Sequence, residues 1–555
     1  MKNRIALVLT LSSAMLTLAQ PAAAQLAQVE QAERSGPRFD VFEYVIEGNT
    51  VLPADVVERA LTPHLGPDRG FRDIEAARNA LEKAYQDAGF LSVLVSLPNQ
   101  KIDSGEVRIE VTETPVSRVD VSGAQYHLPS KLREKLPSLK EGEVPHFPQM
   151  QKELAQVQTA DMQVTPLINA SPDGNAIEVD LQVKDQAPLT GSVEFNNGQS
   201  YNTSRGRLSA SLLHTNLFQL GHTFGLSWQY APYRPADGNI LSLIYGLPLS
   251  ARDDLLLVAT RSDSDTPTGL GGSASPTATV SKGEVIGLRW SRRLTAHSEP
   301  ARHSVFAGLE YKHNRDFNTF VDGLITQRPP LRYTLLTGGY DLSWFGEQGQ
   351  QTRAGTGLKL STQSLGGRKV DCNGTRLEQF DCKRAGASAD FLAWNLNVGH
   401  ARDLIGRWRL DASLNLQLAT GPLPSGEQYS LGGPGTVRGY YDFEQTGDAG
   451  WNTRLELSSP VWLSFAGVEF TSLVFHDRGM VQLDRPQTGQ QARTQLGSVG
   501  LGLRAKGDAG LELSVDLARV IFDTARPVDN GQREFASGPK ADRRYRIDFS
   551  VKQAF

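Results

Sequence analysis

Two-residue alternation of apolar and polar side chains runs through the long C-terminal part of the chain, from residue 189 to residue 555. The segments DASLNLQL (411–418) and LELSVDL (511–517) show it clearly. A strand of this kind buries one row of side chains in an apolar environment, while the other row meets water or polar groups. Because helical periodicity is absent here, the pattern predicts an all-β segment that begins near residue 188.

The alternation divides into a large and even number of strands. We predict sixteen, near residues 189–198, 204–213, 221–231, 239–248, 252–262, 282–293, 303–314, 331–345, 352–362, 388–400, 407–419, 450–460, 465–476, 496–505, 509–519 and 543–555. Short turns such as Pro248 to Asp253 alternate with long polar loops at 263–282, 316–330 and 364–387. A soluble periplasmic β-protein also alternates, but these features and a final strand ending in Phe555 favour an outer-membrane barrel with a polar lumen.

Two copies of one small unit precede the strands. Residues 39–114 follow the order β-α-α-β-β, with a strand in FDVFEYVIEGN, helices at 53–65 and 71–88, and strands in LSVLVSL and VRIEVTE. Residues 115–187 repeat that order. Tandem copies of one unit indicate an elongated array of small α+β domains.

The N-terminus carries the features of a secretory signal peptide. Lys2 and Arg4 precede an apolar run from residue 5 to residue 19, and Ala22-Ala23-Ala24 offers a cleavage site. We therefore predict a signal peptide at 1–24, followed by a short polar segment at 25–38. A short membrane anchor is the alternative, although the apolar run is too short to span a bilayer.

Composition narrows the class of protein further. The net charge is −4, so nothing indicates a nucleic-acid partner. A hydrophobic content of 39% and a mean hydropathy of −0.34 are typical of soluble proteins. No stretch reaches the eighteen apolar residues that a membrane-spanning helix needs. A transmembrane β-barrel is not excluded, because its alternating strands never build such a run.

The chain has two cysteines, Cys372 and Cys382, close together in DCNGTRLEQFDC. In an oxidising compartment they are expected to form one local disulfide, and two free thiols are the alternative. The sequence has no CxxC, HExxH or His/Cys cluster, so we expect neither a metal nor a cofactor.

One glycine-rich stretch, GGPGTVRGY at residues 432–440, holds a single charged residue, Arg438. Glycine and proline mark loops and turns, so an ordinary surface loop is one interpretation. A loop that folds into the barrel is the other.

Several motifs together resemble those of two-partner-secretion outer-membrane transporters, the hemolysin/hemagglutinin secretion-activation type of the Omp85 superfamily. Val437, Arg438, Gly439 and Tyr440 resemble the family's VRGY signature. Phe475, Asp477 and Gly479 resemble its F-x-D-x-G strand motif. The first repeat resembles the family's first POTRA domain at Gly89, Phe90, Leu91, Pro98, Gln100, Gly105, Val107 and Ile109. The last strand resembles the signal read by the barrel-assembly machinery, with Tyr545, Ile547, Phe549, Val551 and Phe555 on one row.

The resemblance implies two POTRA domains, at 39–114 and 115–187, before a 16-stranded transmembrane barrel at 188–555. It also implies that a loop at 421–450 folds back into the lumen, where Arg438 pairs with the barrel-wall residue Asp477. A guanidinium matches a carboxylate through two parallel hydrogen bonds, and glycines let the backbone pass close to the wall. The pair would control the conducting state, or it would only rigidify the barrel.

The function implied is ATP-independent secretion across the Gram-negative outer membrane. POTRA domains in the periplasm would bind an unfolded, β-helical, hemolysin- or adhesin-like exoprotein through an exposed strand edge. Many relatives carry a plug helix, for which residues 25–38 leave little room. The alternatives are an Omp85-type assembly or insertion factor, which often has more POTRA domains, and a passive porin, which needs none. No G-x-S-x-G elbow or Ser/His/Asp set supports an enzyme.

Overall fold

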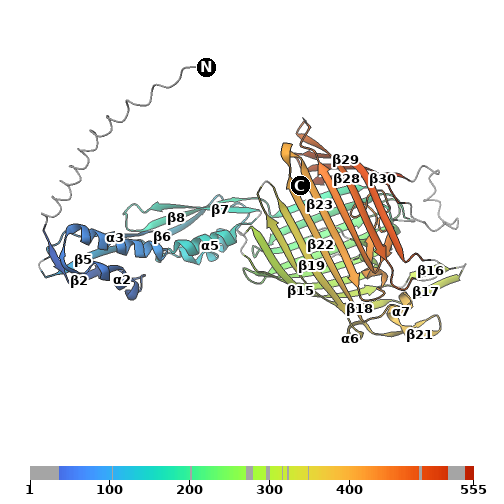
Figure 1. Ribbon diagram of the computed structural model, residues 1–555, viewed down its shortest axis with the longest axis horizontal. Coiled ribbons are helices and arrows are strands. Elements are labelled where there is room, and N and C mark those ends of the chain that lie inside the picture. Colours follow the sequence, from blue (N-terminus) through green and yellow to red (C-terminus); the bar gives the residue numbers. More distant parts are fainter. Residues whose placement is uncertain are drawn as a thin grey trace, which may run out of the picture. The chain divides into compact units, whose positions relative to one another are not determined.

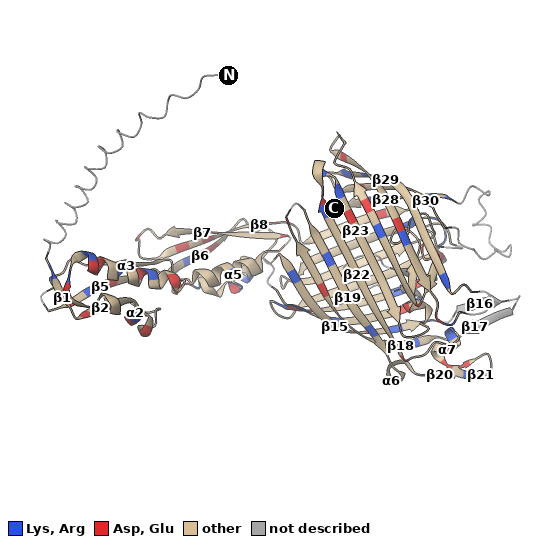
Figure 2. Ribbon diagram, in the orientation of Figure 1, with Lys and Arg blue, Asp and Glu red and all other residues tan. Residues whose placement is uncertain are grey.

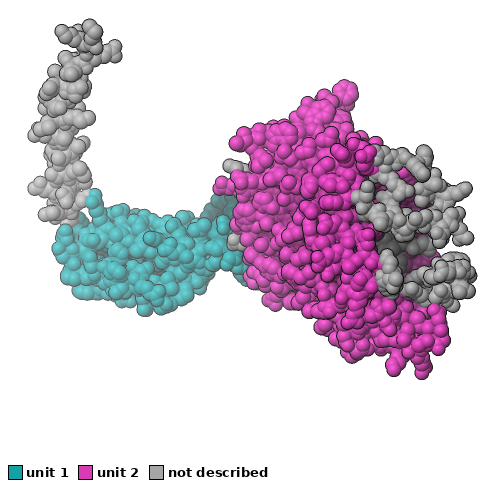
Figure 3. Space-filling model, turned by 45° about the vertical axis from the view of Figure 1, so that its right-hand side comes forward, with its two compact units in different colours: residues 1–186 teal, residues 187–555 magenta. Residues whose placement is uncertain are grey.

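The computed structural model divides into two compact units, residues 1–186 and residues 187–555, coloured teal and magenta in Figure 3. It describes residues 37–102, 104–159, 161–200, 203–269, 279–295, 300–315, 317–321, 324–347, 349–486, 490–522 and 544–555. The predicted signal peptide at 1–24 and residues 25–36 of the segment after it lie outside the described residues.

The first repeat builds a three-stranded sheet covered by two helices. Its elements are β1 (Phe39–Val41), β2 (Glu43–Glu47), α2 (Ala54–Leu61), a 3-10 turn (Thr62–His64), β3 (Gly66–Arg69), α3 (Phe71–Asp87), β4 (Val93–Ser96) and β5 (Glu106–Glu113). The sheet order is β2-β5-β4, with β2 and β5 parallel. Leu81, Tyr85 and Ile109 are fully buried in the core between sheet and helices.

Two local predictions for this repeat were wrong. The first helix ends at Leu61 instead of residue 65, because Pro63 lacks the N–H that would continue it. The single predicted strand at 39–49 is two strands, and β1 pairs with β3 rather than with the main sheet. The sequence of β3, GPDR, has no alternation that could have revealed it.

Among its described residues, the second repeat keeps the order β-α-α-β-β but has no counterpart of β1 and β3. It contains β6 (Val116–Ser122), α4 (Pro129–Glu134), a 3-10 turn (Pro137–Leu139), α5 (Phe147–Val157), β7 (Met162–Ala170) and β8 (Ile177–Asp185). Its sheet order is β6-β8-β7, again with a parallel and an antiparallel pair. The repeats touch where the Phe147 N–H donates to the Gly89 carbonyl (3.0 Å) and the Phe90 ring meets the His146 ring edge-on.

Residues 189–555 form a closed antiparallel barrel, and the sixteen predicted strands are present in order (Figure 1). They are β9 (Leu189–Asn196), β10 (Arg207–Leu217), β11 (His222–Tyr230), β12 (Asn239–Pro248), β13 (Asp253–Gly269), β14 (Thr279–Arg293), β15 (Ala301–Asn314), β18 (Leu331–Phe345), β19 (Gln351–Ser361), β22 (Phe391–Asp403), β23 (Arg409–Ala419), β26 (Ala449–Ser458), β28 (Val468–Gln482), β29 (Arg493–Gly507), β30 (Leu511–Val520) and β31 (Tyr545–Ala554). A three-residue strand, β27 (Leu463–Phe465), pairs antiparallel with the first residues of β28. The predicted fold class is therefore confirmed.

The barrel wall presents apolar side chains outward. Exposed large apolar residues recur on almost every strand, including Leu226, Leu257, Ile286, Leu358 and Leu501. Figure 2 shows the wall strands mostly tan, with few charged residues along them. Such a continuous exposed apolar surface suits lipid. Among the described helices, none is long and apolar enough to cross a membrane.

The two ends of the barrel differ in their connections. At the turn end, where β9 begins and β31 finishes, connections such as 248–253 and 507–511 are short. At the loop end the connections are longer and carry structure of their own. They include the hairpins β16 (Phe317–Val321) with β17 (Leu324–Arg328), β20 (Lys369–Cys372) with β21 (Thr375–Glu378), and β24 (Tyr429–Leu431) with β25 (Gln445–Gly447), and the short helices α6 (Gln363–Gly366) and α7 (Gln379–Lys383).

Candidate functional site: a loop anchored inside the barrel

The connection between β23 and β26, residues 420–448, is packed against the inner wall. Leu431, Val437, Arg438 and Tyr440 are at most 1% exposed, which excludes an ordinary surface loop. The loop leaves and re-enters the wall within two residues of the predicted bounds of 421–450. We call residues 420–448 the lumen loop.

Arg438 makes the ion pair predicted for it. Its Nε donates to Asp477 Oδ2 at 2.7 Å and its Nη2 donates to Asp477 Oδ1 at 2.8 Å. Its backbone N–H also donates to Oδ2 at 3.1 Å. Neither side chain is accessible to solvent. The structure thus joins the glycine-rich motif to β28 through three charge-assisted bonds on one carboxylate.

Two further carboxylates face Arg438, and the sequence did not reveal them. Glu456 of β26 lies 2.8 Å from Nη2, and Asp516 of β30 lies 3.7 Å from Nη1. Arg454 and Arg504 bind Glu456 and Asp516 in turn, at 2.8 and 2.7 Å. Three arginines and three carboxylates therefore surround the tip of the loop. Each buried charge there has a partner of opposite sign.

The other residues of the strand motif complete this anchor. The Arg438 Cζ atom lies 3.5 Å from the centre of the Phe475 ring, which gives a cation–π contact away from solvent. At Gly479 a Cβ atom would come within 3.0 Å of the Trp451 carbonyl and the Leu431 side chain. A larger residue there would push the lumen loop away from the wall.

The remaining residues of the VRGY motif each have a distinct contact. Val437 packs in an apolar cluster with Leu431, Tyr440 and three wall residues. Gly439 has φ of +91°, which favours glycine, and its missing Cβ leaves room for Ala518 of β30. The Tyr440 hydroxyl lies 3.0 and 2.7 Å from the carbonyl oxygens of residues 497 and 522, and its one proton can be donated to either of them.

A second anchor, at Glu427, holds the first half of the lumen loop. Its carboxylate is buried against Lys312, accepts from the Tyr333 hydroxyl at 2.8 Å, and binds Lys359 at 3.3 Å. All three partners lie on barrel strands, so the contact ties the loop to β15, β18 and β19. Glu427 carries no motif in the sequence, and nothing near it signals this role.

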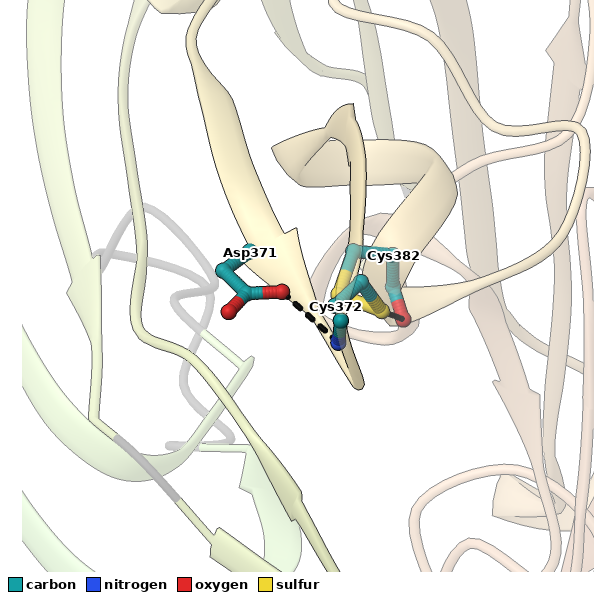
Figure 4. The surroundings of a disulfide bond; sticks show 4 residues. Asp371, Cys372 and Cys382 are labelled. Carbon is teal, nitrogen blue, oxygen red and sulfur yellow. Dashed lines mark hydrogen bonds between the residues drawn. A yellow bond between two sulfur atoms is a disulfide. The ribbon is translucent and has the colours of Figure 1, made fainter.

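A third anchor, at Asp448, holds the end of the lumen loop. Asp448 accepts from the N–H groups of Leu423 and Asp484, at 2.8 and 2.7 Å, and pairs with Arg384. Arg384 lies in the connection that contains Cys372 and Cys382. Those two cysteines form a disulfide that closes this connection on itself (Figure 4).

Four residues of the predicted assembly signal, Tyr545, Ile547, Phe549 and Val551, lie on one row of β31, and Phe555 follows the strand directly. All five are 37% to 71% exposed. β31 pairs with β9 through five residue pairs, whereas β9 and β10 share eight. The seam that closes the barrel is thus shorter than the neighbouring contact.

The lumen next to the loop holds a cavity of about 1090 Å³, above the usual range for small-molecule sites. Polar side chains such as Arg289, Asp341, Asn397 and Asn415 contribute to its lining. The described residues include no group of three or more His, Cys, Asp or Glu side chains placed to hold a metal ion. The arrangement suits a polar conduit narrowed by an anchored loop.

Comparison with known proteins gives matches over both units. Residues 175–505 match the profile of the haemolysin secretion/activation protein family ShlB/FhaC/HecB, and residues 39–114 match the ShlB-type POTRA domain. The outer membrane transporter CdiB of Escherichia coli is 25% identical over 458 residues, covering 77% of this chain and 70% of that protein.

Solved structures of similar fold cover nearly the whole chain. CdiB from Escherichia coli aligns with a TM-score of 0.58 at 17% identity, over 97% of this chain and 98% of that one. CdiB from Acinetobacter baumannii aligns with a TM-score of 0.54 at 15% identity, over 99% and 100%. At these identities the likeness concerns the fold.

Proposed function

Since the chain belongs to the haemolysin secretion/activation protein family, and is thus an outer-membrane transporter of two-partner secretion, we propose that it exports an unfolded, β-helical, hemolysin- or adhesin-like exoprotein. The observation that carries this proposal is the lumen loop, held to the inner wall of a closed barrel by the Arg438–Asp477 pair. A passive porin would need neither POTRA repeats nor the VRGY motif.

The connectivity supports an orientation for the transport path. The two repeats join β9 at the turn end of the barrel. We propose that this end faces the periplasm, with the POTRA domains in that compartment, and that the loop end faces outward. A client would then enter the barrel at the turn end and leave past the long loops.

The POTRA sheets suit an extended client. In the order β2-β5-β4 the edge strands are β2 and β4, and in the order β6-β8-β7 they are β6 and β7. An edge strand presents unpaired N–H and C=O groups, so a client segment can add to it through backbone hydrogen bonds with little demand on its sequence. We propose a transporter that performs no covalent chemistry on its client, and a signal peptide at 1–24 that directs the chain to export.

A secretion assay tests the proposal. We would express a candidate β-helical exoprotein, encoded beside the transporter, with the intact protein, with Arg438→Ala, or with neither. We expect export with the intact protein and a loss of at least about tenfold with Arg438→Ala. Heat-modifiable mobility in gels checks that each barrel is inserted.

Equal export in all three strains would contradict the client assignment. Depletion of other barrels from the outer membrane of the strain without the protein would instead favour an assembly or insertion factor. Those two readouts separate transport from membrane-protein assembly.

A further inference from the structure

The connection between β19 and β22, residues 362–390, folds into a compact segment at the loop end of the barrel. It contains α6, the β20–β21 hairpin and α7, and the Cys372–Cys382 disulfide ties the hairpin to α7 (Figure 4). Gln379 at the start of α7 donates to the Arg332 carbonyl at 2.8 Å and also binds the Gly366 carbonyl. The segment is thus fastened to itself and to β18.

The apolar side of this segment packs against the barrel and the lumen loop. Phe380 is fully buried, and its ring centre lies 5.2 Å from that of Tyr333 and 6.2 Å from that of Phe391. Leu423 of the lumen loop belongs to the same buried cluster. One phenylalanine therefore joins the disulfide-closed segment, two wall strands and the first residues of the lumen loop.

The polar contacts of the segment converge on both ends of the lumen loop. Arg384 Nη2 donates to Asp448 Oδ2 at 2.6 Å, and Nη1 donates to Asp448 Oδ1. The same guanidinium donates to the carbonyls of Leu423 and Asp484, at 2.6 and 3.1 Å. Leu423 and Asp448 stand near the beginning and the end of the lumen loop, so Arg384 joins its two limbs where they meet the wall.

The side chains of Arg438 and Arg384 differ in their exposure to solvent, and this difference affects how easily each ion pair can separate. The Arg438 side chain is 0% exposed, whereas the Arg384 side chain is 16% exposed. Water can hydrate Arg384 and Asp448 as they separate, so the cost of separating them is lower than for a fully buried pair. The contact at the barrel mouth is therefore easier to open than the contact at the loop tip.

We propose that residues 362–390 form a clasp that holds the two limbs of the lumen loop together at the barrel mouth, with Arg384 as its positioning residue. The clasp narrows the exit while Asp448 is bound, and a passing client requires its release. This inference rests on the proposed function, because it takes the lumen as the transport path.

Channel recordings test the clasp without any client. We would reconstitute the full-length protein in planar lipid bilayers and compare wild type with Arg384→Ala. The matched control is Arg376→Ala, an exposed arginine of the β21 strand in the same segment. We expect the fraction of time spent in high-conductance states to rise at least about fivefold for Arg384→Ala. The control should behave as wild type.

A milder variant separates the clasp from a folding defect. Arg384→Lys keeps the positive charge but cannot bind two carboxylate oxygens and two carbonyls at once, so it should give an intermediate open fraction. Gel mobility before and after heating reports whether each barrel is folded. If Arg384→Ala or Arg384→Lys folds normally and conducts as wild type does, the clasp is disproved.

Secretion assays distinguish failure of the clasp from failure of the proposed function. An open clasp with no export by any variant would contradict the client assignment and leave the clasp supported. Normal export together with wild-type conductance in Arg384→Ala would overturn the clasp alone.

Discussion

A single guanidinium decides how the lumen loop is held. Arg438 can be buried because Nε and Nη2 bind Asp477, because the carboxylates of Glu456 and Asp516 lie close to it, and because a phenylalanine ring covers one face. A lysine ammonium has neither the planar fork nor the flat face that stacks on a ring. The position therefore requires arginine, and not simply a positive charge.

Arg438→Lys should accordingly fail to replace the native residue. We expect secretion to fall at least about tenfold, because the two parallel bonds to Asp477 are lost. Arg261→Lys is the matched control, since Arg261 is an exposed residue of β13. The amount of client in the medium gives the readout. Export by Arg438→Lys equal to wild type would contradict the requirement for a planar guanidinium.

Gly439→Ala should loosen the loop tip. The substitution imposes φ of +91° on alanine and brings its Cβ within 3.1 Å of Ala518, at a cost of about 1–3 kcal/mol. Gly435→Ala is the control, because no atom lies within 4 Å of its Cβ. The temperature at which the barrel loses its compact gel mobility should fall for Gly439→Ala and stay unchanged for Gly435→Ala.

The sequence could predict the loop tip but not its full surroundings. Val437, Arg438, Gly439, Tyr440 and Asp477 stand in recognisable motifs. Glu456 and Asp516 lie in ordinary alternating strands, where an inward polar residue looks like any other lumen residue. Their role follows from strand register and from the path of the loop, and neither can be read from spacing alone.

At the scale of elements, long strands were predicted better than short ones. The sixteen barrel strands follow the alternation, because each must face lipid on one side. Parts of the predicted loops 263–282 and 316–330 belong to strands, since β13 continues to Gly269 and β16 pairs with β17. Polar residues can extend a ladder beyond the membrane, where alternation is no longer required.

The last strand of the second repeat ends on a buried acceptor, Asp185. Its carboxylate accepts from the backbone N–H groups of Gln125, Tyr126 and His127, at 3.0, 2.7 and 2.9 Å. Burial by itself raises the pKa of Asp185, but these bonds and one from the His127 ring bring the pKa below its ordinary value. The carboxylate thus stabilises the repeat in its ionised form.

Asp185→Asn should destabilise the fragment 37–186 by about 1–3 kcal/mol at neutral pH. Because the folded pKa is lowered, this stabilisation is complete above the ordinary carboxyl pKa and is lost as the pH falls through the lowered value. Urea unfolding at neutral and acidic pH should show the two proteins converging in acid. A difference in unfolding free energy between the two proteins that stays constant with pH would contradict the role of the carboxylate.

On the scale of the whole molecule, each unit has its own interior. Three apolar clusters fill the repeats. The barrel is closed by hydrogen bonds between its own strands, and its apolar clusters pack around the lumen loop and the clasp. The order of the two units follows from the change in periodicity near residue 188. The barrel should therefore assemble without the repeats.

A barrel of residues 187–555 behind the signal peptide should insert and show heat-modifiable mobility. It should export no client, because the strand edges that we propose for client binding are missing. Outer-membrane fractionation and assay of the medium give the two results. Export by the barrel alone would contradict a POTRA requirement.

The three anchors set the geometry of any movement of the lumen loop. The two limbs of the loop, residues 420–438 and 438–448, are also hydrogen-bonded to each other where β24 pairs with β25. Releasing one anchor leaves the limbs joined, so neither limb can swing clear by itself. The loop would then move as one stiff body, and a travelling chain would meet a single obstruction rather than two.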